Sequence, residues 1–106
     1  MDERRRSPRL NLALPVILRH RGRLIPATLI NLSCGGMYLR SDGSDIASEE
    51  QVEIIFDLDQ ERRDLSLRGN IVRVEEGEKP GLGVQFSNVF SASHKALQHF
   101  LNRSLN

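Results

Sequence analysis

Apolar and polar residues alternate through most of the chain, which is the pattern of β-strands with one buried face. The clearest example is the segment 51–58, in which Val52, Ile54, Phe56 and Leu58 share one face. Further segments with strand character cover residues 14–19, 23–30, 37–40, 65–74 and 82–86. Short polar segments separate these runs, so the sequence predicts six antiparallel strands.

The first two strands are predicted to form a β-hairpin, because only the short turn at Arg21–Gly22 separates them. A hairpin centred on this turn brings residue 31 opposite about residue 12. The segment before the first strand and the turn after the second strand should therefore lie at the same end of the hairpin, and so at the same end of any barrel that the strands form.

The fifth strand is predicted to contain a β-bulge. Leu65 and Leu67 set one phase of the alternation, whereas Val72 and Val74 set the opposite phase. An alternation with a period of two residues changes phase only where a residue is inserted. We therefore expect the bulge at Gly69–Asn70, between the two pairs.

The last part of the chain changes to a helical period. Its apolar residues follow the spacing i, i+3, i+4, i+8 of one helix face, and Ser91 or Ser93 can cap the first turn. These apolar residues are Leu97, Phe100, Leu101 and Leu105. The predicted fold is all-β with a C-terminal helix: a six-stranded antiparallel β-barrel with one opening or flank covered by the helix.

The chain has 106 residues, which is the size of one domain. We expect a flexible basic arm over residues 1–10, the barrel over 11–90 and the helix over 91–106. No apolar run approaches the roughly 20 residues that span a membrane, and no signal-peptide pattern opens the chain. The single cysteine, Cys34, cannot form an internal disulfide. These features favour a cytoplasmic protein.

Positive charge is concentrated near the start of the chain. Residues 1–23 hold seven arginines against Asp2 and Glu3, a net charge of +5, whereas the whole chain has a net charge of +1. The arginines are Arg4, Arg5, Arg6, Arg9, Arg19, Arg21 and Arg23. A segment of this kind attracts an anionic partner.

Two short segments offer groups that bind nucleotides. Residues 4–9 read RRRSPR, and residues 31–36 read NLSCGG. Arginine has a planar fork of donors that fits phosphate and the O6/N7 edge of guanine, and its flat face stacks on purines. In the second segment, Asn31 and Ser33 supply hydrogen-bonding groups. Gly36 permits positive φ and a close approach of a ligand to the backbone.

Together with the barrel pattern, these two segments resemble the PilZ family. The family pattern is R-x-x-x-R followed, after a spacer, by [D/N]-x-S-x-x-G. Residues 5–9 match the first part, and residues 31–36 match the second. Residues 81–86, GLGVQF, are similar to a late strand of the family. The resemblance covers nearly the whole chain, from the arm to the terminal helix.

The resemblance implies a receptor for cyclic di-GMP that orders its arm on binding and signals to an effector protein. Arg4, directly before the R-x-x-x-R segment, implies an intercalated pair of cyclic di-GMP molecules. Asn31 stands where many members have Asp, and an amide accepts guanine N–H bonds less strongly than a carboxylate does. The ligand-binding residues expected from the resemblance and the motifs are Arg4, Arg5, Arg6, Arg9, Asn31, Ser33, Gly35 and Gly36.

Two other functions stay open at this point. A basic arm alone can bind nucleic acid, with an affinity that falls steeply with salt and with little need for Asn31 or Ser33. A PilZ-like domain without ligand binding would instead act through an exposed apolar patch. The sequence has no hydrolase, kinase or dinucleotide-fold signature, so we expect no enzyme activity.

The histidines and neighbouring carboxylates indicate no metal or catalytic site. His20, His94 and His99 have no metal-ligand spacing with Cys, Asp or Glu, and we expect them at the surface or partly buried. Asp57 and Asp59 have no accompanying histidine or metal motif, so we expect them to be exposed to solvent. No cofactor is expected.

Overall fold

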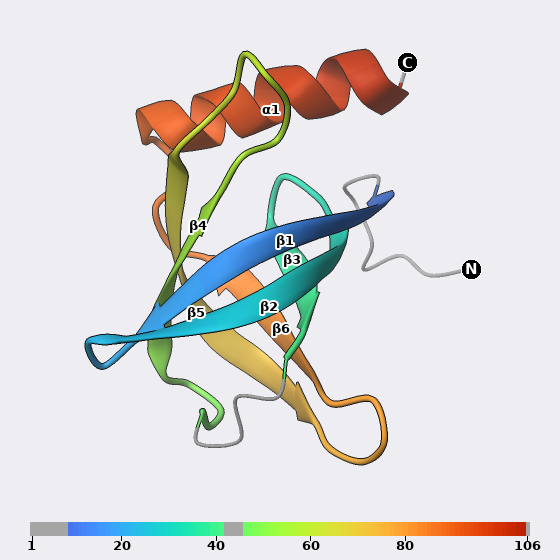
Figure 1. The fold of residues 1–106 in the computed structure, drawn as a ribbon. Helices are drawn as coiled ribbons and strands as arrows, with labels where there is room; N and C mark the ends of the chain where they lie inside the picture. Colours follow the sequence, from blue (N-terminus) through green and yellow to red (C-terminus); the bar gives the residue numbers. More distant parts are fainter. Residues whose placement is uncertain (1–8, 42–45, 106) are drawn as a thin grey trace.

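The computed structural model describes residues 9–41 and 46–105, which form a small barrel and one helix (Figure 1). The strands are β1 (Leu10–His20), β2 (Arg23–Leu32), β3 (Gly36–Arg40), β4 (Gln51–Phe56), β5 (Leu65–Glu75) and β6 (Gly81–Phe86), and the helix is α1 (Ala92–Leu105). The strands close in the order β1-β2-β3-β6-β5-β4, each antiparallel to its neighbours. The predicted six-stranded barrel with a C-terminal helix is confirmed.

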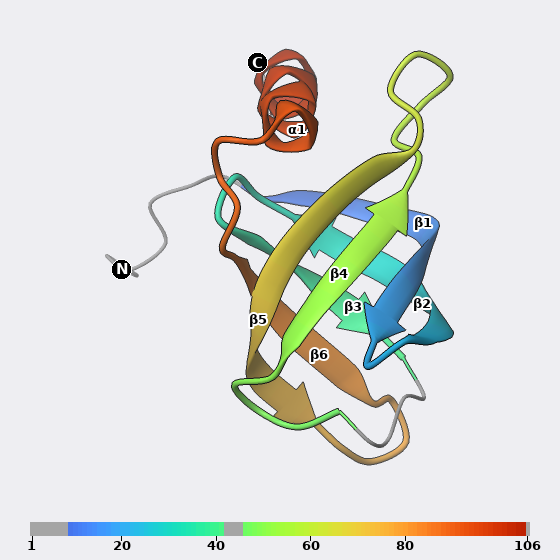
Figure 2. The ribbon, with the colours of Figure 1, turned by 90° about the vertical axis from the view of Figure 1, so that its left-hand side faces the viewer.

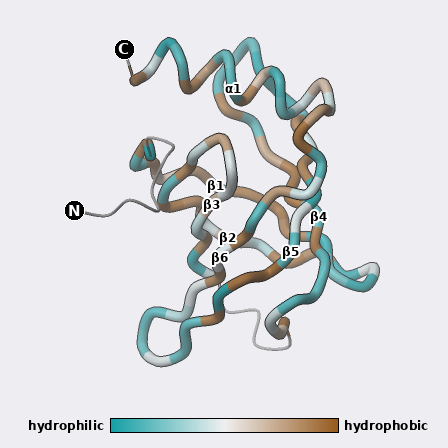
Figure 3. The backbone as a smooth tube through the Cα atoms, turned by 180° about the vertical axis from the view of Figure 1, so that it is seen from behind, coloured by the Kyte–Doolittle hydropathy of each residue, from teal (hydrophilic) through white to brown (hydrophobic). Residues whose placement is uncertain are grey.

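The core lies inside the barrel, because alternate apolar side chains of every strand point inward. Leu18, Leu29, Leu39, Ile54 and Leu67, from five different strands, have no exposed surface. Burial of a side chain of this size stabilises the fold by about 1.5–3 kcal/mol. Hydrophilic residues gather in the connecting loops (Figure 3), so the barrel strands supply most of the core.

Helix α1 covers one end of the barrel (Figures 1 and 2) and packs against β5 and β1. Leu97 and Leu101 seal that end and are 0% and 2% exposed. Of the two predicted caps, Ser91 is the one observed, because its Oγ accepts the His94 amide at 3.1 Å. Ser93 Oγ instead accepts the Ser66 amide of β5 at 3.0 Å. Within the described residues, no helix is long and apolar enough to cross a membrane.

The β1–β2 hairpin has the turn expected from its sequence, but its register shifts by one residue between Asn11 and Leu14. Arg21 and Gly22 both have positive φ, 53° and 79°, as a two-residue type I′ turn requires. The hairpin pairs Asn31 with Asn11, one residue from the expected partner. The start of β1 and the β2–β3 turn therefore lie together, on the side of the barrel below α1 (Figure 1).

The bulge predicted at Gly69–Asn70 is wrong by two residues. Gly69 stays in phase with Leu67 and is buried. It lies so close to β6 that a Cβ at this position would be 2.6 Å from the Gln85 carbonyl oxygen. The register between β5 and β6 shifts between Ile71 and Arg73. As a result, Val72, which lies between them and is expected from the sequence to face inward, is 57% exposed.

Candidate functional site

The two predicted ligand segments meet at the end of the barrel that α1 covers. Arg9 Nη1 donates a hydrogen bond to Asn31 Oδ1 at 3.3 Å, across 22 residues of sequence. Both side chains are accessible to solvent. The other arginines expected in the site, Arg4, Arg5 and Arg6, lie outside the described residues. Within the described residues, the hairpin therefore brings Arg9 of the first segment into contact with Asn31 of the second.

An irregularity in β2 aims Asn31 outward. Ala27 and Leu29 point into the barrel, so strict alternation would bury Asn31 as well. The pairing of β2 with β3 shifts between Leu29 and Asn31, and Leu32 is the next residue to point inward, with no exposed surface. Bulges often re-aim side chains next to functional sites, and here the shift leaves the amide of Asn31 accessible beside Arg9.

The turn after β2 is held by its own hydrogen bonds. The Gly36 carbonyl oxygen accepts the Ser33 amide at 2.9 Å and the Ser33 hydroxyl at 3.3 Å. The Gly35 amide donates to Ser33 Oγ at 3.3 Å. Ser33 is only 9% exposed. Its hydroxyl therefore fixes the shape of the turn, and Asn31 presents the accessible polar group of the segment.

Gly36 is required by strand packing rather than by a positive φ, contrary to the conformational role expected for it. Neither Gly35 nor Gly36 has a positive φ. A side chain at Gly36 would place its Cβ 2.1 Å from the carbonyl oxygen of Val84 on β6, whereas no atom lies within 4 Å of such a position at Gly35. The second motif therefore ends with glycine because β3 and β6 approach closely there.

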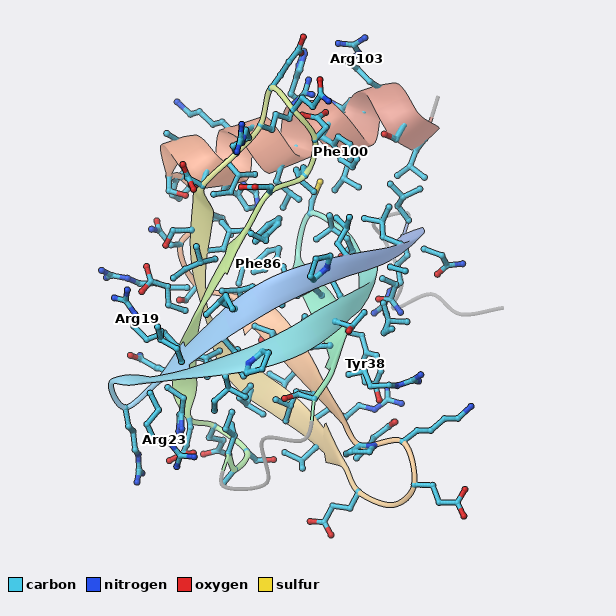
Figure 4. The ribbon with its side chains drawn as sticks, viewed as in Figure 1. Arg19, Arg23, Tyr38, Phe86, Phe100 and Arg103 are labelled. Atoms are coloured by element: carbon cyan, nitrogen blue, oxygen red, sulfur yellow. The ribbon has the colours of Figure 1, made fainter. Side chains whose placement is uncertain are left out.

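An aromatic residue outside both sequence motifs lies next to the site. Tyr38 pairs with Asn31 across β2 and β3 and lies on the outer surface of the barrel (Figure 4). The Arg73 guanidinium is 5.7 Å from the centre of its ring. Strand pairing alone brings Tyr38 beside Asn31, so no motif within the sequence marks it.

Tyr38 and Glu75 form a polar pair with defined charge states. The Tyr38 hydroxyl donates to Glu75 Oε1 at 2.6 Å. This hydrogen bond, followed by partial burial, raises the pKa of Tyr38. Hydrogen bonds from Tyr38 and then Arg73 lower the pKa of Glu75. At neutral pH, Tyr38 is thus a neutral donor beside an ionised carboxylate, and Arg73 partly balances that charge.

Two of the three histidines are more buried than expected. His20 and His94 are 3% and 5% exposed, whereas His99 is exposed. His20 Nε2 lies 2.9 Å from Glu50 Oε1, near the β1–β2 turn. Their burial could not be predicted from spacing, because it depends on how residues 46–50 and the helix pack against the two ends of the barrel. Within residues 9–41 and 46–105, no group of His, Cys, Asp and Glu is arranged to hold a metal ion.

The expected exposure of Asp57 and Asp59 is confirmed. Asp57 Oδ1 accepts the backbone amide of Asp64 at 2.7 Å, and Asp59 Oδ1 accepts the amides of Glu61 and Arg62. The two carboxylates therefore shape the β4–β5 loop.

Comparison with solved structures shows the same fold in proteins of low sequence identity. The inhibitor of motility MotI/DgrA from Bacillus subtilis matches with a TM-score of 0.81 and 24% identity, over 99% of this chain and 53% of that one. The chain thus spans about half the length of the Bacillus protein. The PilZ domain of YcgR from Escherichia coli, with c-di-GMP, matches with a TM-score of 0.72 and 19% identity, over 97% and 95% of the two chains.

The family is established by comparison of the sequence with family models. No curated protein matches the chain. The family model of the PilZ domain, however, matches residues 3–103, which include both ligand segments, all six strands and most of α1. The chain belongs to the PilZ domain family.

Proposed function

We propose that the chain is a bacterial cytoplasmic receptor for cyclic di-GMP, with its site where the arginine segment meets the β2–β3 turn. The observation that carries the proposal is the hydrogen bond from Arg9 to Asn31, which joins the two halves of the family motif at one end of the barrel. The YcgR domain with the same fold is described with c-di-GMP. The proposed ligand-binding residues are Arg4, Arg5, Arg6, Arg9, Asn31, Ser33, Gly35 and Gly36.

Each accessible group in the proposed site suits a part of the ligand. The guanidinium of Arg9 fits a phosphate or the O6/N7 edge of guanine, and it exchanges its bond to Asn31 for one to the ligand. The Asn31 amide then bonds a guanine edge or a neighbouring phosphate. Ser33 acts from within the turn, because its buried hydroxyl holds Gly35 and Gly36 in place.

Ligand binding also orders the basic arm in this proposal. From the sequence, the arm is residues 1–10, before the barrel of residues 11–90 and the helix of residues 91–106, all within one domain. In the structure, β1 already begins at Leu10, so the arm of this proposal ends at residue 9. Ordering backbone costs about 1–2 kcal/mol per residue, and each charge-assisted hydrogen bond to a phosphate returns about 1.5–3 kcal/mol. Ordering an arm of about ten residues therefore costs about 10–20 kcal/mol. Four arginines that each form two such hydrogen bonds to the ligand return about 12–24 kcal/mol, enough to offset this cost.

We further propose that two cyclic di-GMP molecules bind as an intercalated pair, with Arg4 contacting the second one. The surface formed by the ligand and the ordered arm is then recognised by an effector protein. MotI/DgrA is described as an inhibitor of motility, but it is about twice as long as this chain. The effector of this receptor therefore has to be identified separately.

The proposal is tested by isothermal titration of the full chain with cyclic di-GMP at physiological salt, with GTP as the control ligand. We expect saturable binding of cyclic di-GMP alone, at about two ligands per chain if Arg4 has the proposed role. Binding of one ligand per chain would overturn the paired-ligand part only. Absence of binding, or equal binding of GTP, would overturn the receptor function.

A further inference from the structure

A buried histidine of α1 contacts the backbone of the β2–β3 turn from inside the molecule. His94 is 5% exposed, and its Nε2 lies 2.7 Å from the carbonyl oxygen of Cys34. Because a carbonyl oxygen only accepts hydrogen bonds, Nε2 carries the hydrogen and donates it. Cys34 lies between Ser33 and Gly35, so this bond reaches the middle of the turn.

Neighbouring groups fix the position of the His94 ring. The Ser91 hydroxyl caps the His94 amide at the start of α1. The ring of Phe86 stands edge-on to the imidazole, with centroids 5.9 Å apart and an interplanar angle of 83°. Phe86 lies at the end of β6 (Figure 4), and its amide donates to the Gly35 carbonyl oxygen at 2.9 Å. The histidine, β6 and two adjacent carbonyl groups of the turn thus form one connected unit.

Core stability alone does not explain a histidine at this position. Its Nδ1 is buried and has no hydrogen-bond partner among the described residues. A buried polar atom without a partner is unfavourable, and Leu97 and Leu101 of the same helix are simply apolar. The hydrogen bond from Nε2 to Cys34 is what a leucine or phenylalanine at position 94 could not provide.

We propose that His94 is a positioning residue of the ligand site: it holds the Cys34 carbonyl so that the turn between Asn31 and Gly36 is already shaped for the ligand. This inference rests on the proposed function of the turn. A turn preorganised in the free protein loses less conformational freedom on binding, which raises affinity. By linkage, a bound ligand stabilises the docked first turn of α1 to the same extent.

The test compares two substitutions that differ in the donor they leave. His94→Phe keeps an aromatic ring but removes the donor, whereas His94→Gln keeps an N–H group that can reach the carbonyl. Ile54→Val, in the core of β4, serves as the matched control, because a loss of one buried methyl group lowers stability to a similar extent. The three full-length variants and the wild-type chain are titrated with cyclic di-GMP, and amide hydrogen exchange is measured without ligand.

We expect His94→Phe to raise the Kd for cyclic di-GMP about fivefold, which corresponds to about 1 kcal/mol. His94→Gln and Ile54→Val should stay within about twofold of wild type. In the free protein, the amides of Ser33, Gly35 and Phe86 should exchange about fivefold faster in His94→Phe than in Ile54→Val.

Two results would overturn the inference. Equal Kd values for wild type and His94→Phe would do so while leaving the receptor function intact. Unchanged exchange at the amides of Ser33, Gly35 and Phe86 in His94→Phe would do so whether or not the wild-type chain binds cyclic di-GMP. Failure of the wild-type chain to bind is a separate result and counts against the proposed function itself.

Discussion

At the scale of single residues, Arg9 and Asn31 connect the two parts of the proposed site. Their hydrogen bond is exposed, so in water it contributes little to folding. An exposed guanidinium next to an amide is well placed to exchange this contact for a phosphate or guanine. In the proposed function, the pair therefore serves ligand binding rather than stability.

We predict that Arg9→Ala weakens cyclic di-GMP binding about 10-fold to 100-fold, because it removes charge-assisted hydrogen bonds of about 1.5–3 kcal/mol. Thermal unfolding should change little, since the side chain is exposed. Arg68→Ala is the matched control: Arg68 is an exposed arginine on β5, and its loss should leave the Kd unchanged. Equal effects of the two substitutions on Kd would mean that only net charge matters.

Ser33→Ala should weaken cyclic di-GMP binding by about 1 kcal/mol or more, about fivefold. The cause is loss of the hydroxyl that bonds both Gly35 and Gly36 within the turn. Titration of this variant beside Ser48→Ala, which changes an exposed serine of the loop before β4, measures the effect. The two-part site is wrong if Asn31→Ala and Ser33→Ala combined leave the affinity unchanged.

The position of these residues could be predicted only in part. Hairpin geometry placed the start of β1 beside residue 31 to within one residue, because a two-residue turn fixes the register of both strands as far as Leu14. The register then shifts by one residue between Leu14 and Asn11. The close approach behind Gly36 was not predictable, since it depends on β6, which is about 50 residues later in the sequence. The burial of His94 likewise depends on where α1 docks.

At the scale of secondary-structure elements, the contact between β3 and β6 determines the backbone around the site. Gly36 pairs with Gln85, and Phe86 bonds the preceding residue of the turn, Gly35. The turn is thus attached to β6 on one side and to α1 on the other. Its shape is a property of three elements that meet at one end of the barrel.

Two adjacent glycines should respond differently to the same substitution. Gly36→Ala should lower the free energy of unfolding by about 1–3 kcal/mol, because its Cβ would overlap the Val84 carbonyl oxygen at 2.1 Å. Gly35→Ala should change it by less than about 0.5 kcal/mol, since that position is open and needs no positive φ. Urea denaturation of both variants measures the difference. Equal losses would contradict the observed packing of β3 on β6.

Glu50 stabilises the opposite end of the barrel in a pH-dependent way. The backbone amide of Ala47 at 2.9 Å, then His20 and Arg21, lower the pKa of Glu50. A carboxylate with a lowered pKa contributes stability above its ordinary pKa, about 4.3, and loses that contribution as pH falls through the lowered value. Wild type should therefore be more stable than Glu50→Gln at pH 7, and the difference should shrink in acid. A difference that stays constant down to strongly acidic pH would contradict this.

The alternation patterns predicted the number of strands and their order along the sequence, but not the positions of the bulges. Alternation of apolar residues is a local signal and identified all six strands. The bulges in β2 and β5 depend on pairing with β3 and β6, and pairing is not visible within one strand. For this reason the phase change of β5 was placed at Gly69–Asn70, although a glycine is required there by close contact with β6.

At the scale of the whole molecule, the described arginines of residues 9–23 lie in two places with different surroundings. Near the β1–β2 turn, Arg19 pairs with Glu53 at 3.2 Å and Arg21 with Glu50 at 2.5 Å. At the other end, Arg9 contacts a neutral amide. Among the described residues, acidic side chains therefore offset arginine charge at the hairpin turn, whereas the Arg9 guanidinium contacts only a neutral amide and can attract an anion.

The most direct test of the account is a titration of the ¹⁵N-labelled chain with cyclic di-GMP, followed by two-dimensional NMR. We expect the largest shifts at the amides of Arg9 and residues 31–36, and none at the hairpin turn of Arg21 and Gly22. This result would place the ligand where the two segments meet. The largest shifts at the hairpin turn, or no shifts at all, would contradict the central claim that Arg9 and the β2–β3 turn form one cyclic di-GMP site.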